Sequence, residues 1–145
     1  EIIILLENIK FGGNMRKVKE DGILFSMGSI LYCLIELLWR RRTHWSMGIT
    51  GGICLILLYR IDEIFGKNCR IKKCILGSFI ITTIEFIIGC IVNIRLGCHV
   101  WDYSKLPLNF MGQICASFTF LWLLLCIPAY KFCGIIKKTV LVKIK

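Results

Sequence analysis

Four long apolar runs, separated by short charged or polar segments, dominate the chain. A helix of about 20 residues crosses the roughly 30 Å hydrocarbon core of a bilayer, so runs of this length are typical of membrane-spanning helices. The second run is uncharged only as far as Tyr59 and reaches a spanning length by continuing past Arg60 to Phe65. The pattern predicts an all-α, polytopic membrane protein, a bundle of four transmembrane helices at about 22–39, 45–65, 73–94 and 110–129.

The segments outside these runs are short. The apolar stretch 1–11 would extend only about 16 Å as a helix, half of a bilayer, and Gly12 and Gly13 interrupt it. Residues 1–21 are therefore expected to form an N-terminal interfacial or cytoplasmic segment. Residues 131–145 are expected to form a basic cytoplasmic tail, which leaves one membrane domain over 22–130.

Small and polar side chains recur at helical spacing within two of the predicted spans. Their spacings are all 3 or 4, so each set lies on one helical face. Such a face suits packing against neighbouring helices, and it equally suits the lining of a polar pathway. The first span carries Ser26, Ser29, Cys33, Glu36 and Arg40, and the third carries Ser78, Thr82, Glu85, Gly89 and Asn93.

Glu85 lies near the middle of the third predicted span. A carboxylate at that depth costs roughly 2.5 kcal/mol or more unless it is paired, hydrated or protonated. Glu36 precedes Arg40 by four residues, the favoured order for an ion pair on a helix. We predict that Glu36 and Glu85 face the same interior, with Arg40 close to at least one of them. The group would be either a structural hydrogen bond or ion pair, or a binding site for a cation or proton.

The connection between the third and fourth runs, 98–115, is unusually rich in polar and aromatic side chains. Trp and Tyr favour the membrane interface, and side-chain amides can tie a loop to a helix end. The connection is either an interfacial anchor that starts the fourth helix or the lip of a site. We expect Trp101, Asp102 and Tyr103 to be ordered and packed on the outer end of the bundle. Asp102 should accept hydrogen bonds from a neighbouring helix end or pair with an arginine of 40–42. The residues concerned are Trp101 and Tyr103 as loop anchors, and Asp102, Asn109 and Gln113 as polar candidates.

The charge distribution predicts how the chain is oriented. The net charge is +10, and the basic residues cluster at the ends of apolar runs, which points to membrane topology and not to nucleic-acid binding. With four spans, the 19 basic residues divide 14 to 5 in favour of the side that holds both termini and the 66–73 loop. The positive-inside rule then predicts a multi-pass protein of the cell membrane with both termini in the cytoplasm.

Neither metal nor cofactor chemistry is indicated. The nine cysteines include no CxxC pair, and several lie inside apolar runs, where they read as small packing residues. A disulfide between Cys98 and Cys115 stays open. His44 and His99 lie on separate loops, too few for a zinc site. No GxxxxGK[ST] motif occurs, so ATP hydrolysis would require a separate ATPase subunit.

Three blocks of sequence resemble one known family. They are RRRTHWSMGITGG (40–52), TTIEFIIGCIVN (82–93) and WDYSKLPLNFMGQIC (101–115). The chain resembles the small bacterial membrane proteins of the putative ABC-transporter type IV, or CmpB-like, permease family. The resemblance implies a location in the membrane and, as an expectation, a role in transport.

Two main functions follow from these observations. The first is a permease-like component with a polar site in the outer half of the bundle, acting as a homo-oligomer or with a partner membrane subunit. The alternative is a non-transport structural, sensor or assembly subunit whose polar stripes bind only other helices. An intramembrane enzyme is a third hypothesis, but no nucleophile–base spacing supports it. The candidate binding residues are Glu36, Arg40, Glu85, Asn93, Asp102, Asn109 and Gln113.

Overall fold

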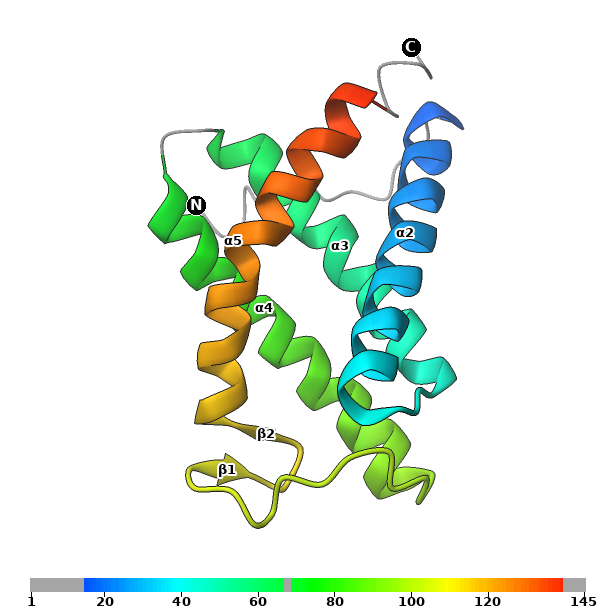
Figure 1. Cartoon of the computed structure of the whole chain (residues 1–145), viewed down its shortest axis with the longest axis vertical. Helices are drawn as coiled ribbons and strands as arrows, with labels where there is room; N and C mark the ends of the chain where they lie inside the picture. The colour runs from blue at the N-terminus through cyan, green and yellow to red at the C-terminus, as the bar shows by residue number, and fades with distance from the viewer. Residues whose placement is uncertain (1–14, 67–68, 140–145) are drawn as a thin grey trace.

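The computed structural model describes residues 15–66 and 69–139, which form four long α-helices. The helices are α2 (Met15–Arg40), α3 (Trp45–Phe65), α4 (Arg70–Gly89) and α5 (Ala116–Thr139), and α4 continues into a π-helical turn, η1 (Cys90–Arg95). In Figure 1 the long axis of the molecule is vertical. The start of α2, the end of α3 and the end of α5 lie toward the top, and the 96–115 loop lies at the bottom. The N-terminal segment predicted for residues 1–21 lies largely outside the described residues.

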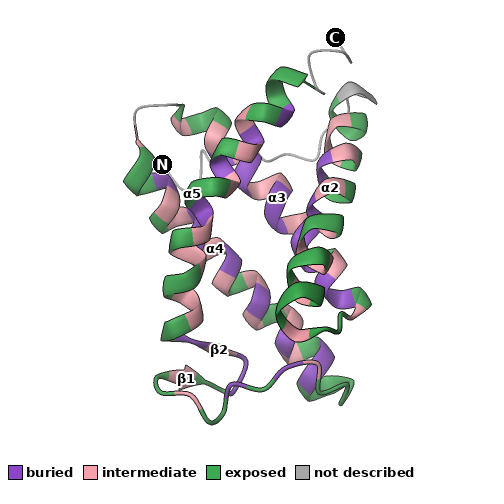
Figure 2. Ribbon diagram, in the orientation of Figure 1, coloured by how far each residue is buried: buried purple, intermediate pink, exposed green. Residues whose placement is uncertain are grey.

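Helix α3 occupies the centre of the arrangement. It packs against α2, α4 and α5, while α2 packs mainly on α3. Buried positions line the inward sides of the helices in Figure 2, and exposed positions cover their outward sides. The sequence of α3 fits this position, because Gly51 and Gly52 near its start allow α2 to approach closely.

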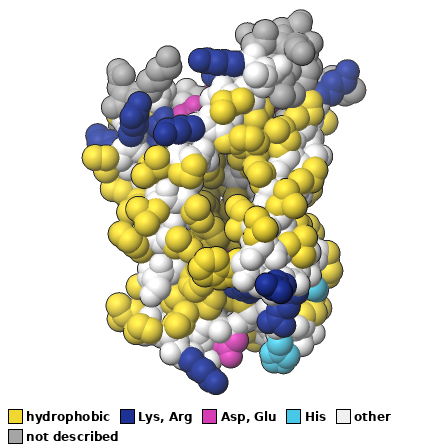
Figure 3. Space-filling view, viewed as in Figure 1, with side chains coloured by type: hydrophobic (Ala, Val, Ile, Leu, Met, Phe, Trp, Pro, Cys, Tyr) yellow, Lys and Arg dark blue, Asp and Glu magenta, His cyan; other side chains and the backbone are white. Residues whose placement is uncertain are grey.

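Three of the described helices are long and apolar enough to cross a membrane, namely Lys17–Arg40, Arg70–Arg95 and Ala116–Thr139. Their outward sides carry exposed large apolar side chains, such as Leu38 on α2, Phe79 on α4 and Phe120 on α5. Figure 3 shows hydrophobic side chains over most of one face, with Lys and Arg toward its two ends. An apolar exterior of this kind is what a lipid-facing surface requires. Helix α3 is not one of these three, and its last turns carry the charged residues Arg60, Asp62 and Glu63.

The closest helix contact joins α2 to α3 at two glycines. A Cβ atom added to Gly51 would lie 2.3 Å from the Cβ of Tyr32 and 2.6 Å from the carbonyl oxygen of Gly28. One added to Gly28 would lie 2.4 Å from the carbonyl oxygen of Gly51. Gly52 lies against the ring of Phe25, whereas Gly48 has room for a side chain.

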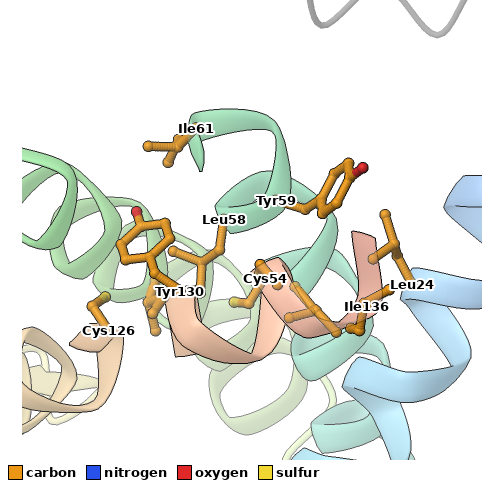
Figure 4. Close-up of a cluster of buried hydrophobic side chains, with 11 residues drawn as sticks. Leu24, Cys54, Leu58, Tyr59, Ile61, Cys126, Tyr130 and Ile136 are labelled. Carbon is orange, nitrogen blue, oxygen red and sulfur yellow. The ribbon is translucent and has the colours of Figure 1, made fainter. Parts of the chain in front are cut away.

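The main hydrophobic core lies between α3, α4 and α5, and Leu24 of α2 completes it. Figure 4 shows Tyr130 and Cys126 of α5 beside Leu58 and Cys54 of α3. The cysteines predicted to be packing residues at positions 54 and 126 are buried here as free thiols.

Ion pairs join the helices at the end of the molecule opposite the loop. Arg60 of α3 pairs with Asp21 and Glu20 of α2, and with Glu63 one turn along its own helix. Lys73 of α4 is buried, and it donates to Asp62 and to the carbonyl oxygen of Gly66. Arg60 is therefore neutralised by acidic side chains of two helices.

The boundaries of the fourth helix differ from the prediction at both ends. Residues predicted to begin the helix at Phe110 form a short antiparallel hairpin, β1 (Asn109–Phe110) with β2 (Ile114–Cys115). Met111 and Gly112 adopt positive φ angles of 52° and 67°, which a helix cannot accommodate, so the helix starts only at Ala116. It then continues through Pro128 to Thr139, well past the predicted end at Ala129.

The glycine contact leads to a stability prediction. Gly51→Ala should force α2 and α3 apart, and it should lower the free energy of unfolding by about 1–3 kcal/mol, as is typical of overpacking. Gly134→Ala is the matched control, because a Cβ there meets no atom within 4 Å. Thermal unfolding of the detergent-purified variants measures both. An unfolding temperature for Gly51→Ala equal to that of the control would contradict the close packing.

Candidate functional site

Glu85 lies inside the bundle, where its carboxylate joins three helices. Its side chain comes from α4, and the residue is only 4% exposed. Oε1 accepts a hydrogen bond from the hydroxyl of Tyr32 on α2 at 3.0 Å. Oε2 accepts one from the indole N–H of Trp122 on α5 at 2.7 Å. Each carboxylate oxygen thus has a donor from a different helix.

Arg40 connects the end of α2 to the loop. Its Nε lies 3.7 Å from Glu36 Oε2, one turn back on the same helix. Its Nη2 donates a 3.2 Å hydrogen bond to the hydroxyl of Tyr103. Tyr32, which donates to Glu85, lies one turn before Glu36 on α2. Of the predicted site residues, Glu36, Arg40 and Glu85 are therefore in one neighbourhood.

Two aromatic members of this neighbourhood, Tyr32 and Trp122, were not among the predicted site residues. Their rings lie 5.9 Å apart between α2 and α5. A signal was present in the sequence, because both are hydrogen-bond donors placed inside apolar spans. A buried Tyr or Trp usually finds a partner for its polar atom. Spacing along the chain could not show that this partner is Glu85.

The polar stripe of α4 faces α5 and the loop. Ser78 donates to the carbonyl oxygen of Thr119 at 2.7 Å, and Thr82 lies 3.2 Å from the hydroxyl of the same residue. Gly89 provides space, because a Cβ there would meet Gln113 Oε1 at 2.6 Å and the Trp101 ring at 3.0 Å. The small positions of the stripe thus serve packing.

Asn93 and Gln113 fasten the loop to the end of α4. Asn93 Nδ2 donates to Gln113 Oε1 at 2.8 Å, and Asn93 Oδ1 accepts from the backbone N–H of Val100 at 2.7 Å. The indole N–H of Trp101 donates to the carbonyl oxygen of Gln113 at 3.0 Å, and Gln113 Nε2 donates to that of Met111 at 3.1 Å. Both amides are buried. Their hydrogen bonds are made within the protein, so they position the loop.

Asn109 closes the tip of the loop. Its Nδ2 donates to the carbonyl oxygens of Ser104 and Leu106, and its Oδ1 accepts from the backbone N–H of Gly112. A side chain that bonds three backbone groups fixes the turn. Asn109 therefore has its hydrogen-bonding groups occupied by the loop itself.

The prediction for Asp102 was wrong about its partner. Asp102 is exposed, and its Oδ1 accepts a 2.8 Å hydrogen bond from the backbone N–H of Ser104. It forms no ion pair with an arginine of 40–42 in the described part of the chain. The hydrogen bond from Ser104 lowers the pKa of the Asp102 carboxyl below its usual value. Asp102 stabilises a local turn.

Trp101 and Tyr103 anchor the loop by packing against the ends of the helices, as expected from the sequence. Each residue is only 6% exposed, so neither ring lies at a membrane surface. They form a second core with Met47 and Cys115, and the Tyr103 ring stacks on Phe118 at 4.6 Å. The ordinary preference of Trp and Tyr for the interface gives way here to burial against the helices.

The described residues contain no buried side-chain nitrogen or oxygen without a hydrogen-bond partner. Within the same residues, no group of three or more His, Cys, Asp or Glu side chains could hold a metal ion. Cys98, exposed, and Cys115, buried, are both free thiols.

Comparison with known proteins gives one match. The family model described as "Putative ABC-transporter type IV" matches residues 23–145. No curated protein and no solved structure matches the chain.

The hydrogen bonds of Asn93 to Gln113 and Val100 lead to a prediction about the loop. Asn93→Leu removes the hydrogen bonds to Gln113 and Val100, so the 96–108 segment should exchange its amide hydrogens faster. Leaving buried polar partners unsatisfied should cost about 1–3 kcal/mol. Thr83→Val is the control, because the Thr83 hydroxyl bonds only Phe79 of its own helix. Hydrogen exchange with mass spectrometry measures both variants. Unchanged exchange in Asn93→Leu would show that the amides do not hold the loop.

The turn at Asp102 leads to a prediction about pH. The pKa of the Asp102 carboxyl is lowered in the folded protein. The hydrogen bond that it accepts from Ser104 therefore stabilises the turn fully above the unfolded pKa of about 3.9. This stabilisation is lost as pH falls through the folded pKa, which lies below that value. Protection of the Ser104 backbone N–H against hydrogen exchange should therefore drop on acidification in the wild type, as measured by hydrogen exchange with mass spectrometry. In Asp102→Asn, protection of this amide should not change over the same pH range. Equal acid sensitivity in the two proteins would contradict the assignment.

Proposed function

Because the chain belongs to the putative ABC-transporter type IV family, we propose that it is a permease-like membrane component. The family and the apolar helices make it a membrane protein related to ABC transporters. The proposal adds a polar binding site in the half of the bundle next to the 96–115 loop. Glu85 is its central residue, with Glu36 and Arg40 beside it.

The observation that carries the proposal is the burial of Glu85 between helices with lipid-facing apolar surfaces. An ionisable group within a span is expensive and marks an ion or proton pathway by default. Arg40 lies beside Glu36 at 3.7 Å, whereas the hydrogen-bond donors to Glu85 are the neutral side chains of Tyr32 and Trp122. An ionised carboxylate inside a span is costly unless a proton or a small cation neutralises it. We therefore propose that the site takes up a proton or a monovalent cation.

The other predicted polar residues have supporting roles in this proposal. Asn93, Asn109 and Gln113 shape the loop that covers the site, and Asp102 holds its outer turn. Tyr103 receives a hydrogen bond from Arg40 and so couples the loop to the site. Movement of the loop would then change the surroundings of Arg40 directly.

We propose that α3 also crosses the membrane, which would give the chain four spans. Its charged end supports this, because acidic side chains neutralise Arg60 and because Lys73 pairs with Asp62. The start of α2 and the end of α5 lie at one end of the molecule, which suits a four-span bundle with both termini in the cytoplasm (Figure 1). On this topology the loop faces outward from the cell membrane.

A bundle of this size is small for a complete transport pathway. We propose that it assembles with a second copy or with a partner membrane subunit. Energy from ATP would come from a separate ATPase subunit, because the sequence contains no P-loop. The basic residues at the opposite end of the bundle are placed to meet anionic headgroups in the cytoplasmic leaflet.

One observation favours the alternative, a structural or assembly subunit. Both oxygens of Glu85 already accept hydrogen bonds from the protein, at 3.0 and 2.7 Å. A buried carboxylate satisfied in this way can simply hold three helices together. The two functions make different predictions for an amide at this position.

The Glu85→Gln substitution distinguishes the transport function from the structural one. The amide can still accept from Trp122 and can donate to the oxygen of Tyr32, so folding should survive with a loss of at most about 1–3 kcal/mol. In proteoliposomes with a pH-sensitive dye inside, an imposed potential should drive proton or cation flux through the wild type. Flux through Glu85→Gln should fall to the background of empty liposomes.

Glu63→Gln is the control, the same chemical change at the opposite end of the bundle. It should keep the wild-type flux. Flux through Glu85→Gln equal to that of the wild type would reject the proposed site. A wild type without flux and a Glu85→Gln variant with a lowered unfolding temperature would establish the structural role instead.

A further inference from the structure

The hairpin at the tip of the loop is built with its polar groups inward and its apolar groups outward. Leu108 is 84% exposed, Met111 59% and Phe110 58%. The amides of Asn109 and Gln113, in contrast, turn inward to bond the backbone. A loop that faces water normally has the opposite polarity.

The outward position of these side chains is held by the backbone. Leu108 and Met111 have φ angles of 53° and 52°, a left-handed conformation that side chains with a Cβ rarely adopt. The pairing of Phe110 with Ile114 and the bonds made by Asn109 keep the turn in this shape. A disfavoured conformation that surrounding bonds maintain is a reason to look for a function.

The exposed apolar tip continues the outer surface of the neighbouring helices. The Phe110 ring lies 5.4 Å from that of Phe86 on α4. Ile87, on the adjoining turn of α4, is 51% exposed, and Phe120 near the start of α5 is 61% exposed. Both helices are long and apolar enough to cross a membrane. The hairpin thus extends an apolar face that lipid would cover.

Exposed tryptophans mark the same end of the molecule. Trp39 closes α2 and Trp45 opens α3, and they are 75% and 59% exposed. Tryptophan concentrates where headgroups meet acyl chains. Trp101 and Tyr103 of the loop cannot contribute, because they are buried.

We propose that the hairpin inserts Leu108, Phe110 and Met111 into the phospholipid interface beside α4 and α5. The partner is the boundary between glycerol and acyl chains in the leaflet at the loop end. Lys105, exposed in the same loop, is placed to reach lipid phosphates. The inserted hairpin would hold the covering loop at a fixed depth. This inference depends on the membrane location of the chain and does not require transport.

Photo-crosslinking from single positions tests the proposal. Benzoylphenylalanine is introduced at position 108, 110 or 111 of the full chain. Each variant is reconstituted in vesicles of phosphatidylethanolamine and phosphatidylglycerol and illuminated, and adducts are identified by mass spectrometry. The matched control is position 99, because His99 is exposed in the same loop but outside the hairpin. Elution as a single species in gel filtration confirms that each variant is folded.

The expected result is phospholipid adducts at positions 108, 110 and 111 and a severalfold lower yield at 99. Crosslinks between two copies of the chain at the hairpin positions would overturn the proposal in favour of a protein interface. An adduct yield at 110 no higher than at 99 would overturn it in favour of a water-exposed tip. Either outcome leaves the flux experiment on Glu85 unaffected, because that residue lies inside the bundle.

Discussion

The hydrogen bonds of Glu85 are the constraint on which the arrangement of helices depends. A carboxylate inside a largely apolar bundle is tolerable only if its oxygens find donors. The donors are Tyr32 of α2 and Trp122 of α5, so α2, α4 and α5 must all present the correct face at the same depth. Hydrophobic burial alone would not require this register, because lipid tails are as apolar as the helix faces they replace.

The two ends of the bundle are held by different chemistry. At one end, charged pairs around Arg60 and Lys73 connect α2, α3 and α4. At the other end, the neutral amides of Asn93 and Gln113 hold the loop against the end of α4. Ion pairs suit an end rich in basic residues. Amides can be buried completely without the desolvation cost of a charge.

The same observations bear on function. A site that binds an ion must hold its carboxylates without satisfying them so completely that nothing can enter. Glu85 is well satisfied, whereas Glu36 is held only at 3.7 Å by Arg40, which also donates to Tyr103 of the loop. Arg40 therefore lies between Glu36, a weakly held carboxylate, and Tyr103 of the 96–115 loop. If the carboxylates exchange a proton or an ion, as we propose, movement of the loop would change the surroundings of Arg40 directly.

The sequence by itself determined the helical class and the approximate positions of the helices, and it predicted that Glu36, Arg40 and Glu85 lie near one another. These follow from hydropathy, from helical spacing and from the cost of a carboxylate in an apolar run, all of which are local. Only the tertiary structure decided that Tyr32 and Trp122 satisfy Glu85, because hydrogen-bond partners 53 and 37 residues apart leave no pattern along the chain. It also decided that Phe110 belongs to a hairpin and that the Trp101 N–H bonds the carbonyl oxygen of Gln113. An apolar run looks the same whether it enters a helix or a turn, and a tryptophan's preference for the interface yields when a core offers its N–H a partner.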